Sequence, residues 1–238
     1  MRNEAGFSGF SKKTLTFLST NHNKNSKQWF EEHRQEYQEY VLTPFRAFSD
    51  ALVPIISQID SEIEVRSHRT VARIYRDTRF SKDKSLYKKA LWITFKRTIE
   101  SWPDFPAFFF ELGPGSYTYG LGFYQASRDT LDKIRIILAQ KPKLLMNQLS
   151  VLKKLPGFRI EGEEYKRALN HAISEKYLSL YQKKNIYFVK TSTVNDKVFS
   201  EAILAEVYDS FGTLGTLYDF LATICVKGID EVARMAVK

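Results

Sequence analysis

The sequence predicts an α+β protein in which an antiparallel meander of about four strands packs with helices from both ends of the chain. Three observations support this prediction. Apolar residues recur at steps of three and four from Phe30 to Ile56, short alternating segments cluster between Arg69 and Tyr124, and helical spacing returns after Ser127. Because the strand-type segments are grouped between helical flanks, α+β order is expected rather than strict βα alternation.

The N-terminal part is expected to be helical. Residues 11–21 predict a short helix, and Asn25 with Gln28 three positions later is typical of a capping box that starts the next one. The long periodic segment that follows contains Pro44. Proline cannot donate a backbone hydrogen bond, so Thr43 and Pro44 predict a kink or a second helix start at this point.

Four segments are typical of strands, namely residues 69–75, 90–97, 107–112 and 117–124, with a tight turn at residues 113–116 between the last two. One further strand is predicted at residues 185–190. After the meander, Ser127 is expected to cap a helix and Pro142 to start another, which ends at Pro156-Gly157. Residues 196–226 predict one or two helices, punctuated by Gly212 and Gly215. We expect one domain over residues 1–238, with a core in residues 1–137 and a mainly helical part in residues 138–238.

Composition excludes several classes of protein. The chain is 43% hydrophobic and 14% aromatic, which is too rich in core-forming residues for a disordered protein. Cys225 is the only cysteine, so no disulfide can form within the chain, and its apolar surroundings favour a core residue over a nucleophile. No apolar run approaches the length of a membrane span, and residues 2–13 lack a signal-peptide pattern. We therefore expect a cytoplasmic protein with no membrane partner.

Charge is concentrated in residues 73–89, which we call the basic segment. The net charge of the chain is +9, and this segment holds seven cationic and two acidic side chains. We expect a strand that ends near Arg76, a loop, and then a short helical turn capped by Ser81, an order of elements that suits anions. The predicted ligand-binding residues are Arg73, Arg76, Arg79, Ser81, Lys82, Lys84, Tyr87 and Lys88, and the predicted acid/base or orienting residues are Asp77 and Asp83.

The remaining chemistry-bearing residues give weaker signals. The four histidines lack metal-ligand spacing, and we assign no metal ligands, no cofactor and no reaction. Glu111, at the end of a strand, either reaches solvent or pairs with an arginine of the basic segment; in the second case it could hold a divalent cation with Asp77 or Asp83. No phosphate-binding loop, dinucleotide fingerprint or nucleophile elbow is present.

Several motifs resemble a bacterial family called domain of unknown function 2461. The strongest is RIYRDTRFSKDKSLYK at residues 73–88, supported by NKNSKQWF at residues 23–30 and by the glycines of residues 108–124. The resemblance runs to about Ile137. The chain departs from the family pattern at Leu86, where a proline is usual, and at Gln125 and Ala126 after the glycine-rich hairpin. The resemblance implies kinship and no established activity.

Three functions stay open on this evidence. The first is a pocket, with or without catalysis, that binds a small molecule carrying a phosphate or a carboxylate through the basic segment. The second is nucleic-acid binding, with Tyr75 or Tyr87 stacking on bases beside the cations. The third is a structural or partner-binding protein in which Asp77 and Asp83 neutralise the arginines as an internal salt-bridge network.

Overall fold

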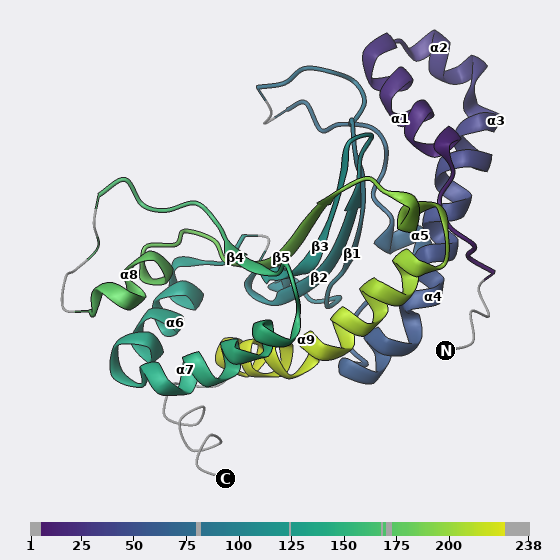
Figure 1. The fold of residues 1–238 in the computed structure, drawn as a ribbon. Helices are drawn as coiled ribbons and strands as arrows, with labels where there is room; N and C mark the ends of the chain where they lie inside the picture. The colour runs from purple at the N-terminus through teal and green to yellow at the C-terminus, as the bar shows by residue number, and fades with distance from the viewer. Residues whose placement is uncertain (1–5, 80–81, 124, 168, 170–172, 227–238) are drawn as a thin grey trace. The chain divides into compact units, whose positions relative to one another are not determined.

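The computed structural model describes residues 6–79, 82–123, 125–167, 169 and 173–226 (Figure 1). Its residues group into two compact units, each assembled from separate segments of the chain. Unit 1 comprises residues 1–95, 109–119 and 191–209, and unit 2 comprises residues 96–108, 120–190 and 210–238. Several secondary-structure elements contribute residues to both units. That residues 1–238 fold as one domain stays a prediction.

The helices of unit 1 begin with α1 (Lys12–Lys24), α2 (Lys27–Glu32) and α3 (Arg34–Tyr37), followed by the π-helical turn η1 (Gln38–Leu42), α4 (Thr43–Ile59) and the short α5 (Ser67–Thr70). Ser11 caps α1 in a capping box with Thr14. Asn25 ends α1 in the left-handed conformation, φ 48°, which asparagine tolerates better than most residues. Ser26, not Asn25, caps α2 by accepting the Trp29 N–H at 3.3 Å, so the predicted cap was wrong by one residue.

Pro44 produces the π-helical turn. In an α-helix residue 44 would donate to the carbonyl of Tyr40, and proline has no N–H to donate. The orphaned Tyr40 carbonyl instead accepts a hydrogen bond from the hydroxyl of Thr14, a fully buried residue of α1, and the Thr43 N–H donates to the carbonyl of Gln38 five residues back. The prediction that Pro44 disturbs the helix is therefore confirmed, although the helical path continues through it. π-Helical turns recur at functional sites.

The α+β class is confirmed, with five strands in place of about four. They are β1 (Leu91–Phe95), β2 (Pro106–Leu112), β3 (Ser116–Phe123), β4 (Arg159–Glu161) and β5 (Tyr187–Thr193), and their order in the sheet is β1-β2-β3-β5-β4. The strand predicted at residues 69–75 is absent as such. Residues 67–70 form α5, and only Val71 and Tyr75 make isolated antiparallel bridges, to Ile93 and Tyr87.

Phenylalanines fill the core of unit 1. Phe10 lies 5.0 Å from Phe45 and 5.8 Å from Phe110 between ring centroids, and Phe48 lies 4.5 Å from Phe110 and 4.9 Å from Phe7. All five rings are buried. Each buried ring contributes about 1.5–3 kcal/mol, so this cluster fixes the N-terminal segment and α4 against β2.

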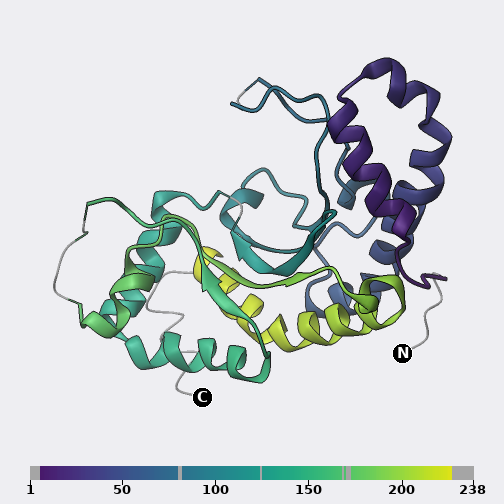
Figure 2. The same cartoon turned by 45° about the horizontal axis from the view of Figure 1, so that its top comes forward.

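Unit 2 holds α6 (Arg128–Gln140), α7 (Pro142–Leu149) and α8 (Glu175–Tyr181), and α8 lies beside α6 in Figures 1 and 2. Ser127 caps α6 and Pro142 starts α7, as predicted. The helix α9 (Ala202–Val226) runs through Gly212 and Gly215 without a break, so their predicted role as punctuation was wrong. Phe108 packs on Phe211 and Tyr218, with centroids 4.8 Å and 5.4 Å away. The short 3₁₀ turns η2 (Trp102–Asp104), η3 (Ser150–Lys154) and η4 (Asp196–Phe199) complete the described elements.

Candidate functional site

The basic segment folds as an irregular antiparallel ladder within unit 1. Arg76 N–H donates to the carbonyl of Leu86 and Lys88 N–H donates to that of Ile74, both at 2.9 Å. No helical turn follows the loop in residues 82–90, so the predicted strand-loop-helix order was wrong for the part that the structure describes. Ser81, the predicted cap, lies outside the described residues. The two strands of this ladder place residues from both ends of the basic segment side by side.

Aspartate turn chemistry explains the missing helix. The Asp77 carboxylate accepts the Arg79 N–H at 3.1 Å, and the Asp83 carboxylate accepts the Ser85 N–H at 2.9 Å. Such side-chain bonds to a backbone N–H two residues later stabilise tight turns and compete with helix formation. Each aspartate of the basic segment therefore shapes the loop as well as carrying charge.

The end of α1 anchors the ladder. The Asn25 side-chain carbonyl accepts the Leu86 N–H at 2.6 Å, and His22 Nδ1 lies 3.0 Å from the carbonyl of Tyr87. Because a carbonyl only accepts, that imidazole nitrogen is the donor. Sequence reasoning did not assign His22 or Asn25 to the site. The sequence signal that could have found Asn25 is the preference of asparagine for the left-handed conformation at the end of a helix, where its side chain is turned outward.

Three cations come together on this ladder. Lys88 Nζ donates to the carbonyl of Arg73 at 2.7 Å and lies 4.0 Å above the centre of the Trp92 ring. Partial burial, followed by the positive charges of Arg73 and Arg76, lowers the pKa of Lys88 to about 8. Burial is the larger cause, and the two arginines add to it, so an anion beside Lys88 would stabilise its charged form. We call Arg73, Arg76 and Lys88 the cation cluster.

Acidic groups neutralise the cation cluster only in part. Arg76 pairs with Asp83 at 3.1 Å, whereas its buried Nε has no hydrogen-bond partner among the described residues. Among the described residues, no carboxylate oxygen is recorded within 4.0 Å of a side-chain nitrogen of Arg73 or Lys88. The side-chain amide of Asn21, next to His22 in α1, is fully buried and likewise has no partner within the described chain. Buried polar atoms without partners are rare and mark places for water or ligand.

The remaining predicted residues of the basic segment make contacts of other kinds. Arg79 forms an exposed two-bond pair with Asp77, at 3.0 Å and 2.7 Å. Lys84 donates to the carbonyl of Thr78 at 2.7 Å, and Lys82 is exposed. Tyr87 is 1% exposed, with its ring stacked 5.0 Å from Phe30, so it belongs to the core beneath the ladder.

The two predicted acid/base residues are held in their charged form. Hydrogen bonds from Arg79 lower the pKa of Asp77 to about 2. Hydrogen bonds from Ser85, and then the charges of Arg76 and His22, lower the pKa of Asp83. Carboxylates that stay ionised at neutral pH are suited to orienting arginines, and they are poor proton donors.

Other candidate groups do not join the cation cluster. Glu111 is exposed on β2 and makes no ion pair with the arginines of the described basic segment. No group of three or more His, Cys, Asp or Glu side chains in the described chain is arranged to hold a metal ion. Burial raises the pKa of Cys225 to about 12, and its thiol donates to the carbonyl of Asp104 at 2.9 Å, which opposes a nucleophilic role.

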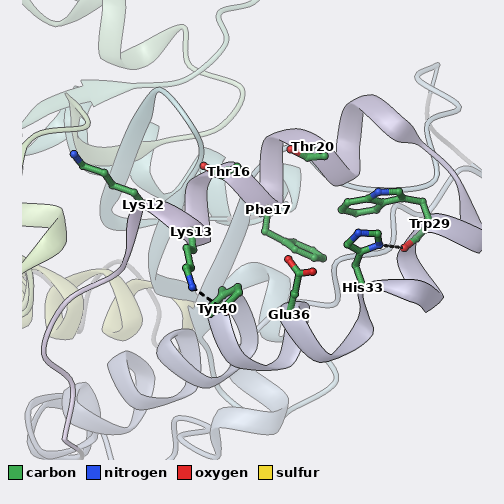
Figure 3. Close-up of a pocket in the computed structure, with 9 residues that line it drawn as sticks. All are labelled: Lys12, Lys13, Thr16, Phe17, Thr20, Trp29, His33, Glu36 and Tyr40. Atoms are coloured by element: carbon green, nitrogen blue, oxygen red, sulfur yellow. Dashed lines mark hydrogen bonds between the residues drawn. The ribbon is translucent and has the colours of Figure 1, made fainter.

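A cavity of about 530 Å³ lies in unit 1 between α1 and the helix formed by α2, α3 and η1 (Figure 3). Its walls include Phe17, Trp29, His33, Glu36 and Tyr40, and none of the described residues of the basic segment lines it. The volume is within the range of small-molecule sites. Nothing in the sequence pointed to this cavity, because it depends on how two helical segments, residues 12–20 and 29–40, pack against each other.

The family model described as a conserved hypothetical protein (DUF2461) matches residues 13–220. The chain belongs to this family. The match covers α1, the basic segment, the sheet and most of α9, so it extends well beyond Ile137, where the sequence resemblance was expected to fade. No curated protein matches the chain. Among the described residues of this DUF2461 member, no helix combines the length and the apolar character that crossing a membrane requires.

Proposed function

We propose that this DUF2461 protein binds a small molecule that carries a phosphate or a carboxylate, and that the cation cluster holds the anionic group. The observation that carries the proposal is the position of Lys88, which is bonded to the Arg73 carbonyl and feels the charges of both Arg73 and Arg76, while Asp83 pairs with Arg76. An anion placed among these three groups would remove their mutual repulsion. It would also give the buried Arg76 Nε a hydrogen-bond acceptor.

The ladder is suited to this role because its backbone fixes the three cations. Lys88 is tied to Arg73 through a side-chain bond to its carbonyl, and Arg76 faces Leu86 across the ladder. Asn25 and His22 hold the second strand from α1. Preorganised donors lose little entropy on binding, so most of the interaction energy with the anion is retained. Asp83 then orients Arg76, and Asp77 with Arg79 shapes the loop.

The first test compares three charge-matched variants by calorimetric titration with sulfate and with inorganic phosphate. Arg73→Gln and Lys88→Gln are expected to weaken anion binding at least tenfold, which corresponds to about 1.4 kcal/mol each. Arg79→Gln removes the same charge from the same segment, but its guanidinium is exposed and makes two hydrogen bonds to Asp77, so a change of less than about twofold is expected. Equal losses in all three variants would mean diffuse attraction, and an unmodified protein that binds neither anion overturns the proposal.

The second test uses pH. Lys88, with a pKa lowered to about 8, is fully protonated below about pH 7 and loses its charge as the pH rises through 8. Sulfate keeps its charge throughout this range, so its affinity is expected to fall several-fold between about pH 7 and pH 9.5. Lys88→Arg retains the positive charge, and its sulfate affinity should stay level over the same range. A decline of equal size in Lys88→Arg would assign the titration to another group.

Nucleic-acid binding is the second candidate because Tyr75, in the middle of the ladder, is 46% exposed beside Arg76. A single-stranded oligonucleotide would then bind more tightly than phosphate, lose affinity steeply with added salt, and lose about 1–3 kcal/mol in Tyr75→Ala. Small-molecule binding predicts that Tyr75→Ala leaves sulfate affinity unchanged. The same variant therefore separates the two functions.

A further inference from the structure

The cavity of Figure 3 has two ends of opposite chemical character. At one end, Lys13 Nζ donates to the Tyr40 hydroxyl at 3.0 Å and lies 4.4 Å from the centre of its ring. At the other end, the Trp29 and His33 rings stack with centroids 4.0 Å apart. Phe17 and the carboxylate of Glu36 lie between them in Figure 3. The cavity therefore runs from a cationic end, past the Glu36 carboxylate, to an aromatic end at Trp29 and His33.

The cationic end presents donors to a ligand. The hydrogen bond to Tyr40 raises the pKa of Lys13, so its ammonium stays charged. The Tyr40 oxygen accepts from Lys13, which leaves the phenolic proton available to a ligand acceptor. An ammonium and a hydroxyl side by side suit a carboxylate.

The middle and the opposite end of the cavity present acceptors. His33 Nδ1 lies 2.8 Å from the carbonyl of Trp29, so this nitrogen is the donor and, in the neutral imidazole, Nε2 is left as an acceptor. Glu36 follows one helical turn later and makes no ion pair or hydrogen bond that the structure records among described residues. A carboxylate, an imidazole nitrogen and aromatic faces together suit an ammonium group, which gains from both charge and ring contact.

We propose that this cavity binds a short linear zwitterion of the amino-acid type, with its carboxylate at Lys13 and Tyr40 and its ammonium at Glu36 and His33. Helix geometry sets the length of the ligand. Glu36 and Tyr40 are four residues apart, which is about 6 Å along a helix axis. The π-helical turn that contains Tyr40 is tied to α1 by the bond from the Thr14 hydroxyl, which fixes the cationic end of the cavity.

The test is an NMR titration of the whole protein that follows the indole N–H signal of Trp29, assigned with Trp29→Phe. The ligands are glycine, 4-aminobutanoate and 8-aminooctanoate. Butylamine and butanoate, which carry one charge each, are the control ligands. We expect 4-aminobutanoate, whose charges are about 6 Å apart, to bind at least tenfold more tightly than butylamine or butanoate. Glycine and 8-aminooctanoate should bind more weakly than 4-aminobutanoate because their charges do not match the span.

Matched variants separate the two ends from general charge effects. Glu36→Gln and Lys13→Met should each weaken 4-aminobutanoate binding at least fivefold. Glu32→Gln, on the same stretch of helix but bonded to Gln28 at 2.9 Å, and Lys24→Met at the end of α1 should leave it unchanged. Equal affinity for 4-aminobutanoate and butylamine, equal effects of Glu36→Gln and Glu32→Gln, or no binding of any ligand in the series would each overturn the inference. These variants leave the cation cluster intact, so sulfate titration of the same proteins should give the affinity of the unmodified protein, and the two proposals can fail independently.

Discussion

Tyr87→Ala is expected to lower the free energy of unfolding by about 3–5 kcal/mol, the usual cost of removing a large aromatic side chain from a core. Tyr87 is 1% exposed, and its ring lies 5.0 Å from Phe30 and 5.3 Å from Tyr75. These contacts join α2 to both strands of the ladder, so the cavity left by alanine has walls that cannot collapse easily. Chemical denaturation followed by tryptophan fluorescence measures the change.

Tyr87→Phe is the control for this prediction and also tests a ligand role of the hydroxyl. The ring contacts remain, so stability should change by less than about 1 kcal/mol. Sulfate affinity should stay within about twofold if Tyr87 supports the ladder from the core. A tenfold loss of sulfate affinity in Tyr87→Phe would instead place its hydroxyl at the anion. A small effect of Tyr87→Ala on stability would contradict the role of the Tyr87 ring in the core beneath the ladder.

Gly120→Ala is expected to destabilise the protein by about 3–5 kcal/mol. A methyl group at Gly120 in β3 would lie 2.1 Å from the carbonyl oxygen of Phe188 and 2.9 Å from the Cα of Val189 in the neighbouring strand β5. Both are backbone atoms, so the contact can be relieved only by moving one strand away from the other, which costs hydrogen bonds and packing together. Thermal unfolding measured by calorimetry reports the loss.

Gly115→Ala gives the matched control. Gly115 lies in the turn before β3, and a methyl group there would meet no atom within 4 Å. Its replacement should therefore change stability by less than about 0.5 kcal/mol, or raise it slightly by restricting the unfolded chain. Similar losses at Gly115 and Gly120 would show that glycine flexibility, and not the close approach of β5, is the reason for the effect.

Sequence periodicity predicted the helices well where one face is apolar. The buried residues Tyr37, Phe45, Phe48, Leu52 and Ile56 follow the predicted stripe closely. Prediction was less successful at single-residue detail. Asn25 and Ser26 are both good caps, and only the packing of α1 decides that the first ends one helix and the second starts the next. The same limit applies to α9, where tertiary packing overrides the low helix propensity of Gly212 and Gly215.

Charge density identified the basic segment, but it did not predict which of its charges meet. Arg79 and Lys82 are as basic as Arg73 and Lys88, yet the former lie on the loop, whereas the Lys88 side chain reaches across the ladder to the backbone carbonyl of Arg73. The pairing of Tyr75 with Tyr87 decides this, and it is a non-local contact that spacing alone cannot reveal. His22 and Asn25 were missed for the same reason, since their partners are more than 60 positions away in the chain.

Thr14 and Pro44 also have a consequence for the order in which unit 1 assembles. Because Pro44 has no N–H, the carbonyl of Tyr40 has no hydrogen-bond donor within its own helix. Its partner is a side chain of α1, so the helix that contains Pro44 completes its hydrogen bonds only when α1 packs against it. We infer that the two helices gain protection from hydrogen exchange as one cooperative unit, and that the walls of the cavity between them form or open together.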